Sequence, residues 1–167
     1  MFELNLEEDQ RWMREALLLA QQAADQGEVP VGAVVVLNGQ IIGRGFNSPI
    51  SKLDPSAHAE VLALREAALT LGNYRLVEAD LYVTLEPCMM CAGALVHARI
   101  RRVIYAATEP KSGAHVSQLP AFDLPHLNHH PQVRAGVLAE ESSALLSAFF
   151  KQRRAQKRAA KQAQAPE

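Results

Sequence analysis

Two short motifs contain residues whose types and spacing suit metal-assisted chemistry: His58-x-Glu60 and Pro87-Cys88-x-x-Cys91. Cysteines separated by two residues can direct both sulfurs from one helical turn to a single ion, and a histidine adds a third ligand. Three protein ligands with one open position are typical of catalytic zinc sites. Zinc lowers the pKa of water in that position from ~16 to roughly 7, so hydroxide is available at neutral pH.

Glu60 is predicted to move protons beside this metal. A carboxylate next to the activated water can take its proton and pass it to a ring nitrogen. Residues i and i+2 do not share a helix face, so His58 and Glu60 can converge only at the start of a helix. Helix starts also offer unpaired N–H groups and a positive dipole end, which lower the pKa of cysteine thiols.

The two cysteines of the chain, Cys88 and Cys91, admit other interpretations. A C-x-x-C pair in a reducing compartment is also typical of a redox dithiol, and a structural zinc site is closed by four protein ligands. A redox pair leaves the H-x-E motif unexplained, and a structural site would need a second histidine or an acid as its fourth ligand. The remaining histidines are expected to be surface or loop residues: His97, His115, His126, His129 and His130.

Hydrophobic patterning predicts the elements that position these motifs. A helix is expected over 7–26, followed by a β-hairpin over 31–46 with Asn38-Gly39 as its turn. The first motif is expected to open a helix that residues 54–56 introduce and that runs to residue 72, and the second to open a helix over 88–98 after a strand over 81–85. Further strands are expected over 102–107 and 133–137. This order favours an α/β fold with a mixed sheet and helices on both faces.

Length and composition predict one globular domain over residues 1–161, with a basic C-terminal helix from about 140 and a frayed tail over 162–167. No stretch is long and apolar enough to span a membrane, and the acidic start MFELNLEEDQ is not a secretory signal, so a cytoplasmic location is expected. Residues 1–150 carry a net charge of −6 and residues 151–167 a net charge of +5. A polyanionic partner is therefore expected near the basic end.

H-x-E followed by P-C-x-x-C is the signature of zinc nucleobase deaminases. Longer stretches of the chain resemble one branch of the cytidine/deoxycytidylate deaminase superfamily, the bacterial tRNA-specific adenosine deaminases. These stretches are Glu28 to Val34, Asn47 with Pro49, Asp54 to Glu60, Asn73 to Leu76, Leu81 to Ala94 and Ser142 to Phe150. The resemblance implies a cytidine-deaminase-like three-layer sandwich with a central mixed five-stranded sheet, one zinc ion per subunit bound by His58, Cys88 and Cys91, and a homodimer.

The resemblance also implies a reaction: hydrolytic deamination of adenosine to inosine at the wobble position of the tRNA anticodon stem-loop. Zinc-activated water would attack C6 of a flipped adenine, with Glu60 as proton shuttle, so the enzyme would be a hydrolase acting on cyclic amidine C–N bonds. Asn47 would bind the flipped nucleotide, although an asparagine before Ser-Pro is also a common turn former. Ala59 and Glu109 would contact the substrate. RNA-backbone contacts would come from Lys111, Lys151, Arg153, Arg154, Lys157 and Arg158, with Lys161 nearby.

Some features leave other functions open. Thr108 and Glu109 stand where that branch is expected to have an Arg-Asp pair, and Pro110 stiffens the backbone next to them. These departures concern contacts to the nucleotides beside the target and not the zinc chemistry. The Pro- and His-rich segment 119–131 also differs, and the basic end fits a solvated tail as well as an RNA site. One rival is a deaminase of a free base or nucleoside, such as cytidine, deoxycytidylate or guanine. Another is a non-catalytic zinc-stabilised RNA-binding protein, in which Glu60 would be dispensable.

Overall fold

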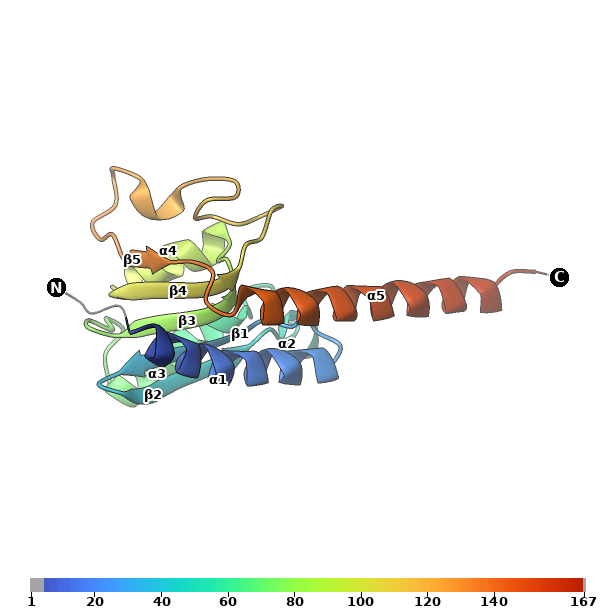
Figure 1. The fold of residues 1–167 in the computed structure, drawn as a ribbon, viewed down its shortest axis with the longest axis horizontal. Helices are drawn as coiled ribbons and strands as arrows, with labels where there is room; N and C mark the ends of the chain where they lie inside the picture. Colours follow the sequence, from blue (N-terminus) through green and yellow to red (C-terminus); the bar gives the residue numbers. More distant parts are fainter. Residues whose placement is uncertain (1–4, 167) are drawn as a thin grey trace.

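The protein is described here by a computed structural model that covers residues 5–166, and it is built around one five-stranded sheet (Figure 1). Residues 1–4 and 167 of the predicted domain and tail lie outside the described residues. In chain order the elements are α1 (Leu6–Asp25), β1 (Gly32–Leu37), β2 (Gln40–Phe46), α2 (Pro49–Lys52), α3 (Ala59–Leu71), β3 (Asp80–Leu85), α4 (Met89–His97), β4 (Arg102–Ala107), a 3-10 turn (Ala121–Asp123), β5 (Gln132–Arg134) and α5 (Ala139–Ala163).

The sheet is mixed, with the strand order β2-β1-β3-β4-β5. β1 runs antiparallel to both β2 and β3, whereas β3, β4 and β5 are parallel. Asn38 and Gly39, between β1 and β2, both have positive φ, at 50° and 71°. That backbone conformation is the one for which Asn-Gly hairpin turns are favoured. The predicted α/β fold with a mixed sheet is therefore confirmed.

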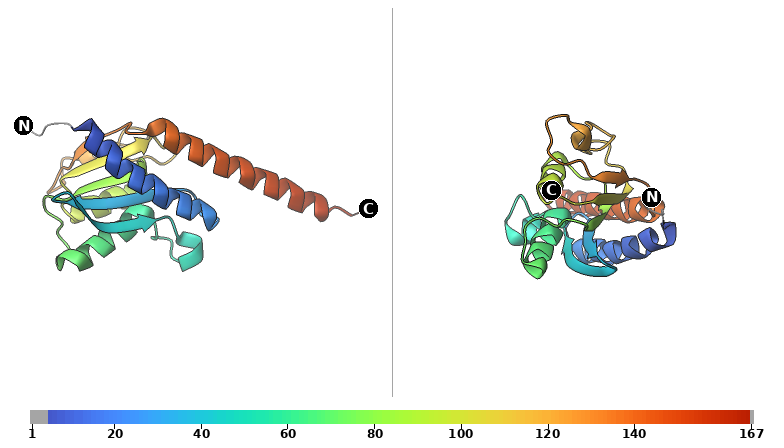
Figure 2. Two further views of the ribbon diagram at one scale, coloured as in Figure 1. Left: turned by 60° about the horizontal axis from the view of Figure 1, so that its bottom comes forward. Right: turned by 90° about the vertical axis from the view of Figure 1, so that its left-hand side faces the viewer.

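Alternate residues of the strands face two separate cores, which makes the molecule three layers thick (Figure 2). On one face, odd-numbered residues of β1, β3 and β4 pack against α3 and α4. On the other face, even-numbered residues of the same strands pack against α1 and the residues that lead into α5. This alternation is what a strand buried on both faces requires, because successive side chains point in opposite directions.

Glycines in β2 allow α3 to lie directly on the sheet. A Cβ atom at Gly45 would collide with the carbonyl oxygen of Ala59, and one at Gly43 would collide with that of Ala63. Only a residue without a side chain permits so close an approach of a strand and a helix. The first turn of α3, which carries the H-x-E motif, is thereby held against the sheet.

The helix that carries the first motif begins where the motif predicts: α3 starts at Ala59 with His58 as its N-cap, and residues 54–56 precede it. The short helix α2 was not predicted. Asp54 accepts hydrogen bonds from the backbone N–H and the hydroxyl of Ser56, which makes residues 54–56 a turn. Aspartate and serine compete for backbone groups in this way and favour turns over helix interiors.

The last helix extends well beyond the rest of the molecule (Figure 1). The start of α5 contacts β4, β3 and α1, and the side chain of Ser142 is buried. All residues from 154 to 163 are exposed. α5 ends at Ala163, two residues later than the domain end expected at 161, and fraying beyond it stays a prediction. None of the helices in the described range is long and apolar enough to cross a membrane.

Candidate active site

His58 and Cys88 occupy matching positions on two helices. Each is the N-cap residue of its helix, His58 of α3 and Cys88 of α4, and neither side chain caps its own helix. Instead the side chains face one another: Nδ1 of His58 lies 3.6 Å from the Sγ atoms of both Cys88 and Cys91. The three potential ligand atoms all lie within 4.8 Å of one another.

This donor set fits a tetrahedral zinc ion. Bonds of ~2.3 Å to sulfur and ~2.0 Å to nitrogen at tetrahedral angles place those two ligand atoms about 3.6 Å apart. The observed nitrogen–sulfur distances agree with that separation. Within the part of the chain that the structure describes, no other group of three metal-binding side chains comes together. The arrangement therefore has three ligands and room for a fourth from solvent or substrate.

The surroundings of the two thiols act on their acidity in opposite directions. A hydrogen bond from Cys91 is the main influence that lowers the pKa of Cys88, to about 4, and a bond to His58 adds to it. The same thiol–thiol bond, together with burial, raises the pKa of Cys91. Zinc binds thiolates, so metal binding favours loss of the thiol protons.

Glu60 lies in the first turn of α3, next to the ligands, and only 4% of it is exposed. Burial raises the pKa of its carboxyl group, with interactions from Cys91 opposing that shift. A carboxyl group with a raised pKa accepts a proton more readily near neutral pH than an exposed one. This is the property that a proton carrier needs.

A cavity of about 130 Å³ opens above these residues, lined by Val29, Val31, Asn47, His58, Glu60, Leu85, Glu86, Cys88, Glu109 and Ser112. At ~30 Å³ per water molecule, this is room for roughly four waters, well below the ~300 Å³ at which pockets for drug-sized ligands begin. A single flat group such as a base suits it, and the remainder of a larger substrate must lie outside.

Asn47 connects the cavity to the start of α3. The side-chain oxygen of Asn47 accepts a hydrogen bond from the backbone N–H of Ala59 at 3.0 Å, and the backbone N–H of Asn47 donates to the carbonyl of Val31. The asparagine thus holds the helix start in addition to lining the cavity. Because the oxygen is engaged, the amide nitrogen is the end of the side chain that can donate to a base. Ala59 is fully buried, and substrate contacts of both residues stay predictions.

The segment after β4 forms the opposite wall. Glu109 and Ser112 line the cavity, and a side-chain oxygen of Glu109 accepts a hydrogen bond from the N–H of Lys111 at 2.9 Å. Lys111 itself is exposed. Sequence reasoning identified Glu109 but missed Ser112, together with Glu86 and the apolar wall of Val29, Val31 and Leu85.

Glu86 is a buried acid that the motif analysis passed over, although it directly precedes Pro87-Cys88. Burial alone would raise its pKa, but hydrogen bonds from Ser117 and from backbone N–H groups of His115, Ser117 and Glu109 lower the pKa to about 2. The group is therefore a carboxylate at neutral pH, and its position one residue before the Pro-Cys pair was the available signal.

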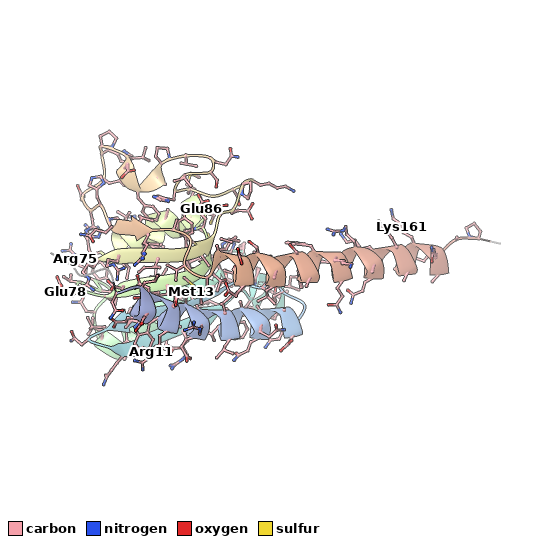
Figure 3. The ribbon with its side chains drawn as sticks, in the orientation of Figure 1. Arg11, Met13, Arg75, Glu78, Glu86 and Lys161 are labelled. Carbon is pink, nitrogen blue, oxygen red and sulfur yellow. The ribbon has the colours of Figure 1, made fainter. Side chains whose placement is uncertain are left out.

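The basic residues of the C-terminal end lie apart from the cavity. Lys161 stands near the tip of the projecting helix (Figure 3). Arg153 packs its guanidinium 5.7 Å from the ring of Phe149, and the other cations of this end are exposed: Lys151, Arg154, Lys157, Arg158 and Lys161. The structure does not bring them to the zinc ligands, so any role in RNA binding concerns parts of a substrate outside the cavity.

Comparison with known families agrees with this site. The family described as the cytidine and deoxycytidylate deaminase zinc-binding region matches residues 6–107, which include all three ligands and Glu60. The chain belongs to this deaminase family, and zinc is its cofactor.

Individual relatives are similar over nearly the whole chain. A tRNA-specific adenosine deaminase of Haemophilus influenzae is 51% identical over 151 residues, covering 90% of this chain and 87% of the relative. One from Bacillus subtilis is 45% identical over 154 residues, covering 92% and 96%. A solved structure from a study of A-to-I editing by tRNA:A34 deaminases at the wobble position is 46% identical, with a TM-score of 0.80 over 81% of this chain and 99% of that one. A guanine deaminase from Nitrosomonas europaea, 24% identical with a TM-score of 0.69 over 84% of this chain and 83% of that one, shares the fold.

Proposed function

We propose that this protein is a zinc-dependent hydrolase that deaminates adenosine to inosine at the wobble position of tRNA. The chemistry rests on one observation, the convergence of His58, Cys88 and Cys91 beside the buried Glu60. The choice of tRNA adenosine rests on relatives of that name, which are 41–51% identical over most of the chain.

The residues of the site have distinct tasks in this reaction. His58, Cys88 and Cys91 would hold the zinc ion, which would lower the pKa of water to about 7 and so provide the nucleophile for C6 of the adenine. Glu60 takes the proton that this water loses and delivers it to N1 of the base. It then takes the proton of the new hydroxyl group at C6 and gives it to the departing amine, which leaves as ammonia. Asn47 donates from its amide nitrogen to the base and holds it in the cavity.

The small size of the cavity favours a substrate base that is turned out of the RNA. A base stacked among its neighbours cannot reach a buried metal site, and enzymes of this chemistry extrude it. Glu109 and Ser112 contact the flipped nucleotide and its neighbours, while Lys111 and the cations of α5 contact phosphates further away. Because the net charge of −6 lies in residues 1–150, the phosphate contacts are confined to Lys111 and the basic end.

The partner of this site is the anticodon stem-loop, and the working enzyme is a cytoplasmic homodimer. The dimer and the stem-loop follow from the resemblance to the tRNA-specific adenosine deaminases, and the cytoplasm is where tRNA is modified and cysteines stay reduced.

A substrate panel tests the proposal. Purified zinc-loaded protein is incubated with an anticodon stem-loop that carries a wobble adenosine, with the same stem-loop carrying guanosine, and with free cytidine, deoxycytidylate and guanine. Inosine formed only in the adenosine stem-loop, and absent with Glu60→Ala protein, is expected. Turnover of a free base or nucleoside with none on the stem-loop would assign the site to a different substrate class.

A further inference from the structure

One carboxylate next to the active site collects an unusual number of hydrogen bonds. Glu86, of which 3% is exposed, accepts from the N–H of Glu109 at 3.1 Å and from the hydroxyl of Ser117 with one oxygen. Its other oxygen accepts from the N–H groups of His115, Val116 and Ser117 at 2.9, 3.1 and 3.2 Å. Five donors on two oxygens occupy the lone pairs that a carboxylate offers.

These donors come from the two ends of a single loop, residues 109–117. Glu109 follows β4 by two residues, and Ser117 lies at the return of the loop, so the carboxylate ties the ends together. Gly113, at the middle of the loop, lies so close that a Cβ atom there would collide with the carboxylate of Glu86. The loop is therefore wrapped around this side chain, and the hydrogen bonds leave it no part in proton transfer.

The same loop carries the side chains that form one wall of the cavity, Glu109 and Ser112. Glu86 itself is anchored in the sheet, because its N–H donates to the carbonyl of Ala107 in β4 at 2.8 Å. The end of β3 thus fixes, through the carboxylate of Glu86, where the loop places Glu109 and Ser112. Hydrogen bonds from N–H groups to a charged acceptor are the stronger kind, about twice a neutral pair.

We propose that Glu86 is a positioning residue that sets the loop 109–117, and with it Glu109 and Ser112, for binding of the target nucleotide. The inference rests on the proposed function for the identity of that nucleotide. It assigns Glu86 to substrate binding and not to the metal or to proton transfer. A change at Glu86 therefore raises KM for RNA and leaves zinc content and kcat nearly as they were.

Asp9 provides a matched control. Its buried carboxylate accepts hydrogen bonds from the hydroxyl of Tyr82 and from Arg102 and Arg134, but it is not among the residues that line the cavity. Asp9→Asn weakens the fold through the loss of a buried charge, as Glu86→Gln does, without touching the loop. It separates lost stability from lost positioning.

The experiment compares wild type, Glu86→Gln, Ser117→Ala and Asp9→Asn on a wobble-adenosine stem-loop, with zinc measured in each. Gln keeps the shape but turns one acceptor into a donor that faces N–H groups, so KM should rise about tenfold, the effect of one to two hydrogen bonds. Ser117→Ala removes one donor and should raise KM by about twofold to fivefold. Asp9→Asn should leave KM unchanged. Equal KM for Glu86→Gln and wild type, or a zinc loss that accounts for the defect, overturns the proposal.

Two further measurements show that Glu86 acts through the loop. In a double-mutant cycle, Glu86→Gln should raise KM less in a Glu109→Ala background than in wild type, because the positioned side chain is already gone. Additive effects would contradict the proposal. Amide hydrogen exchange at residues 115–117 should be faster in Glu86→Gln, and unchanged protection would also contradict it. Because exchange needs no substrate, it tests the loop even if wild type fails to edit the stem-loop, a failure that would count against the proposed function alone.

Discussion

The two ends of the sheet use buried charged residues in opposite ways. At the end where β3 and β4 begin, Asp9 and Asp80 form ion pairs of 2.7–3.3 Å with three arginines: Arg101, Arg102 and Arg134. At the end where those strands finish, Glu60, the two cysteines and His58 surround the cavity. Glu78 and Glu86, just outside the two ends of β3, mark them in Figure 3.

The two ends of the sheet differ in whether their buried charged groups are paired with a group of opposite charge. Among the described residues, no ion pair involves a residue that lines the cavity. Asp9 and Asp80 at the far end both face cations, and Asp80 binds Arg101 through both oxygens, at 2.8 and 2.7 Å. Paired charges hold elements together and have no capacity left for a ligand, whereas uncompensated groups retain the capacity to bind metal or carry protons. Buried carboxylates therefore serve the fold at one end and chemistry at the other.

The zinc ligands should give the largest effect. Cys88→Ser and Cys91→Ser proteins are expected to lose the metal and with it all deaminase activity, and to unfold at lower temperature, because the metal stabilises only the folded state. Metal analysis, activity and a thermal melt check this. Full zinc occupancy in both variants would show that these cysteines are not the ligands, and the proposed difference between the two ends of the sheet would then fail.

Substitutions of Glu60 should have the second-largest effect on activity. Glu60→Ala and Glu60→Gln are expected to lower kcat by about 10²-fold or more with zinc content and melting temperature retained, since only the proton carrier is removed. Single-turnover kinetics on the stem-loop measure it. A variant that deaminates at the normal rate would show that the buried carboxylate is not part of the chemistry.

At the far end the expected effect falls on stability alone. Asp9→Asn removes a charge that compensates Arg102 and Arg134 and should lower the free energy of unfolding by about 2 kcal/mol. Urea denaturation of the zinc-loaded protein gives this value, and steady-state kinetics at low temperature should match wild type. A change in kcat would mean that the paired network also serves the reaction.

Among the described residues, the cations of α5 form no ion pair either, and replacing them should have the smallest effect. Replacing Lys157, Arg158 and Lys161 together by alanine should weaken stem-loop binding by up to about tenfold at low salt and reduce its salt dependence. Free-nucleotide binding in the cavity serves as the control and should not change. If the triple variant binds the stem-loop with the same salt dependence as wild type, the basic end is a solvated tail and not an RNA-binding site.

Much of this contrast was readable in the sequence. The His58 and Cys88 motifs are recognisable from the spacing of their residues, and the near-continuous apolar runs of β1, β3 and β4 indicate strands buried on both faces. The Asn38-Gly39 hairpin likewise depends on neighbouring residues only. Features decided by short-range pattern were therefore predictable.

Features that depend on distant partners were not. Glu86 and Ser117 are 31 residues apart, and nothing local indicates that one carboxylate meets the N–H groups of a remote loop. Asp9 and Arg134 are 125 residues apart and meet only because the fold places the first turn of α1 beside the end of β5. The short helix α2 was also missed, and the N–H groups of its Ile50 and Ser51 donate to the carboxylate of Glu28, 22 and 23 residues earlier.

The exposed half of α5 has a thermodynamic consequence of its own. With residues 154–163 unsupported by packing and no acid between Lys151 and Lys161, this segment depends on intrinsic propensity against mutual repulsion of its cations. Its helix–coil equilibrium should shift toward coil on warming and toward helix as anions screen the charge. Circular dichroism of the folded protein should then show a gradual, salt-sensitive change well below the cooperative melt.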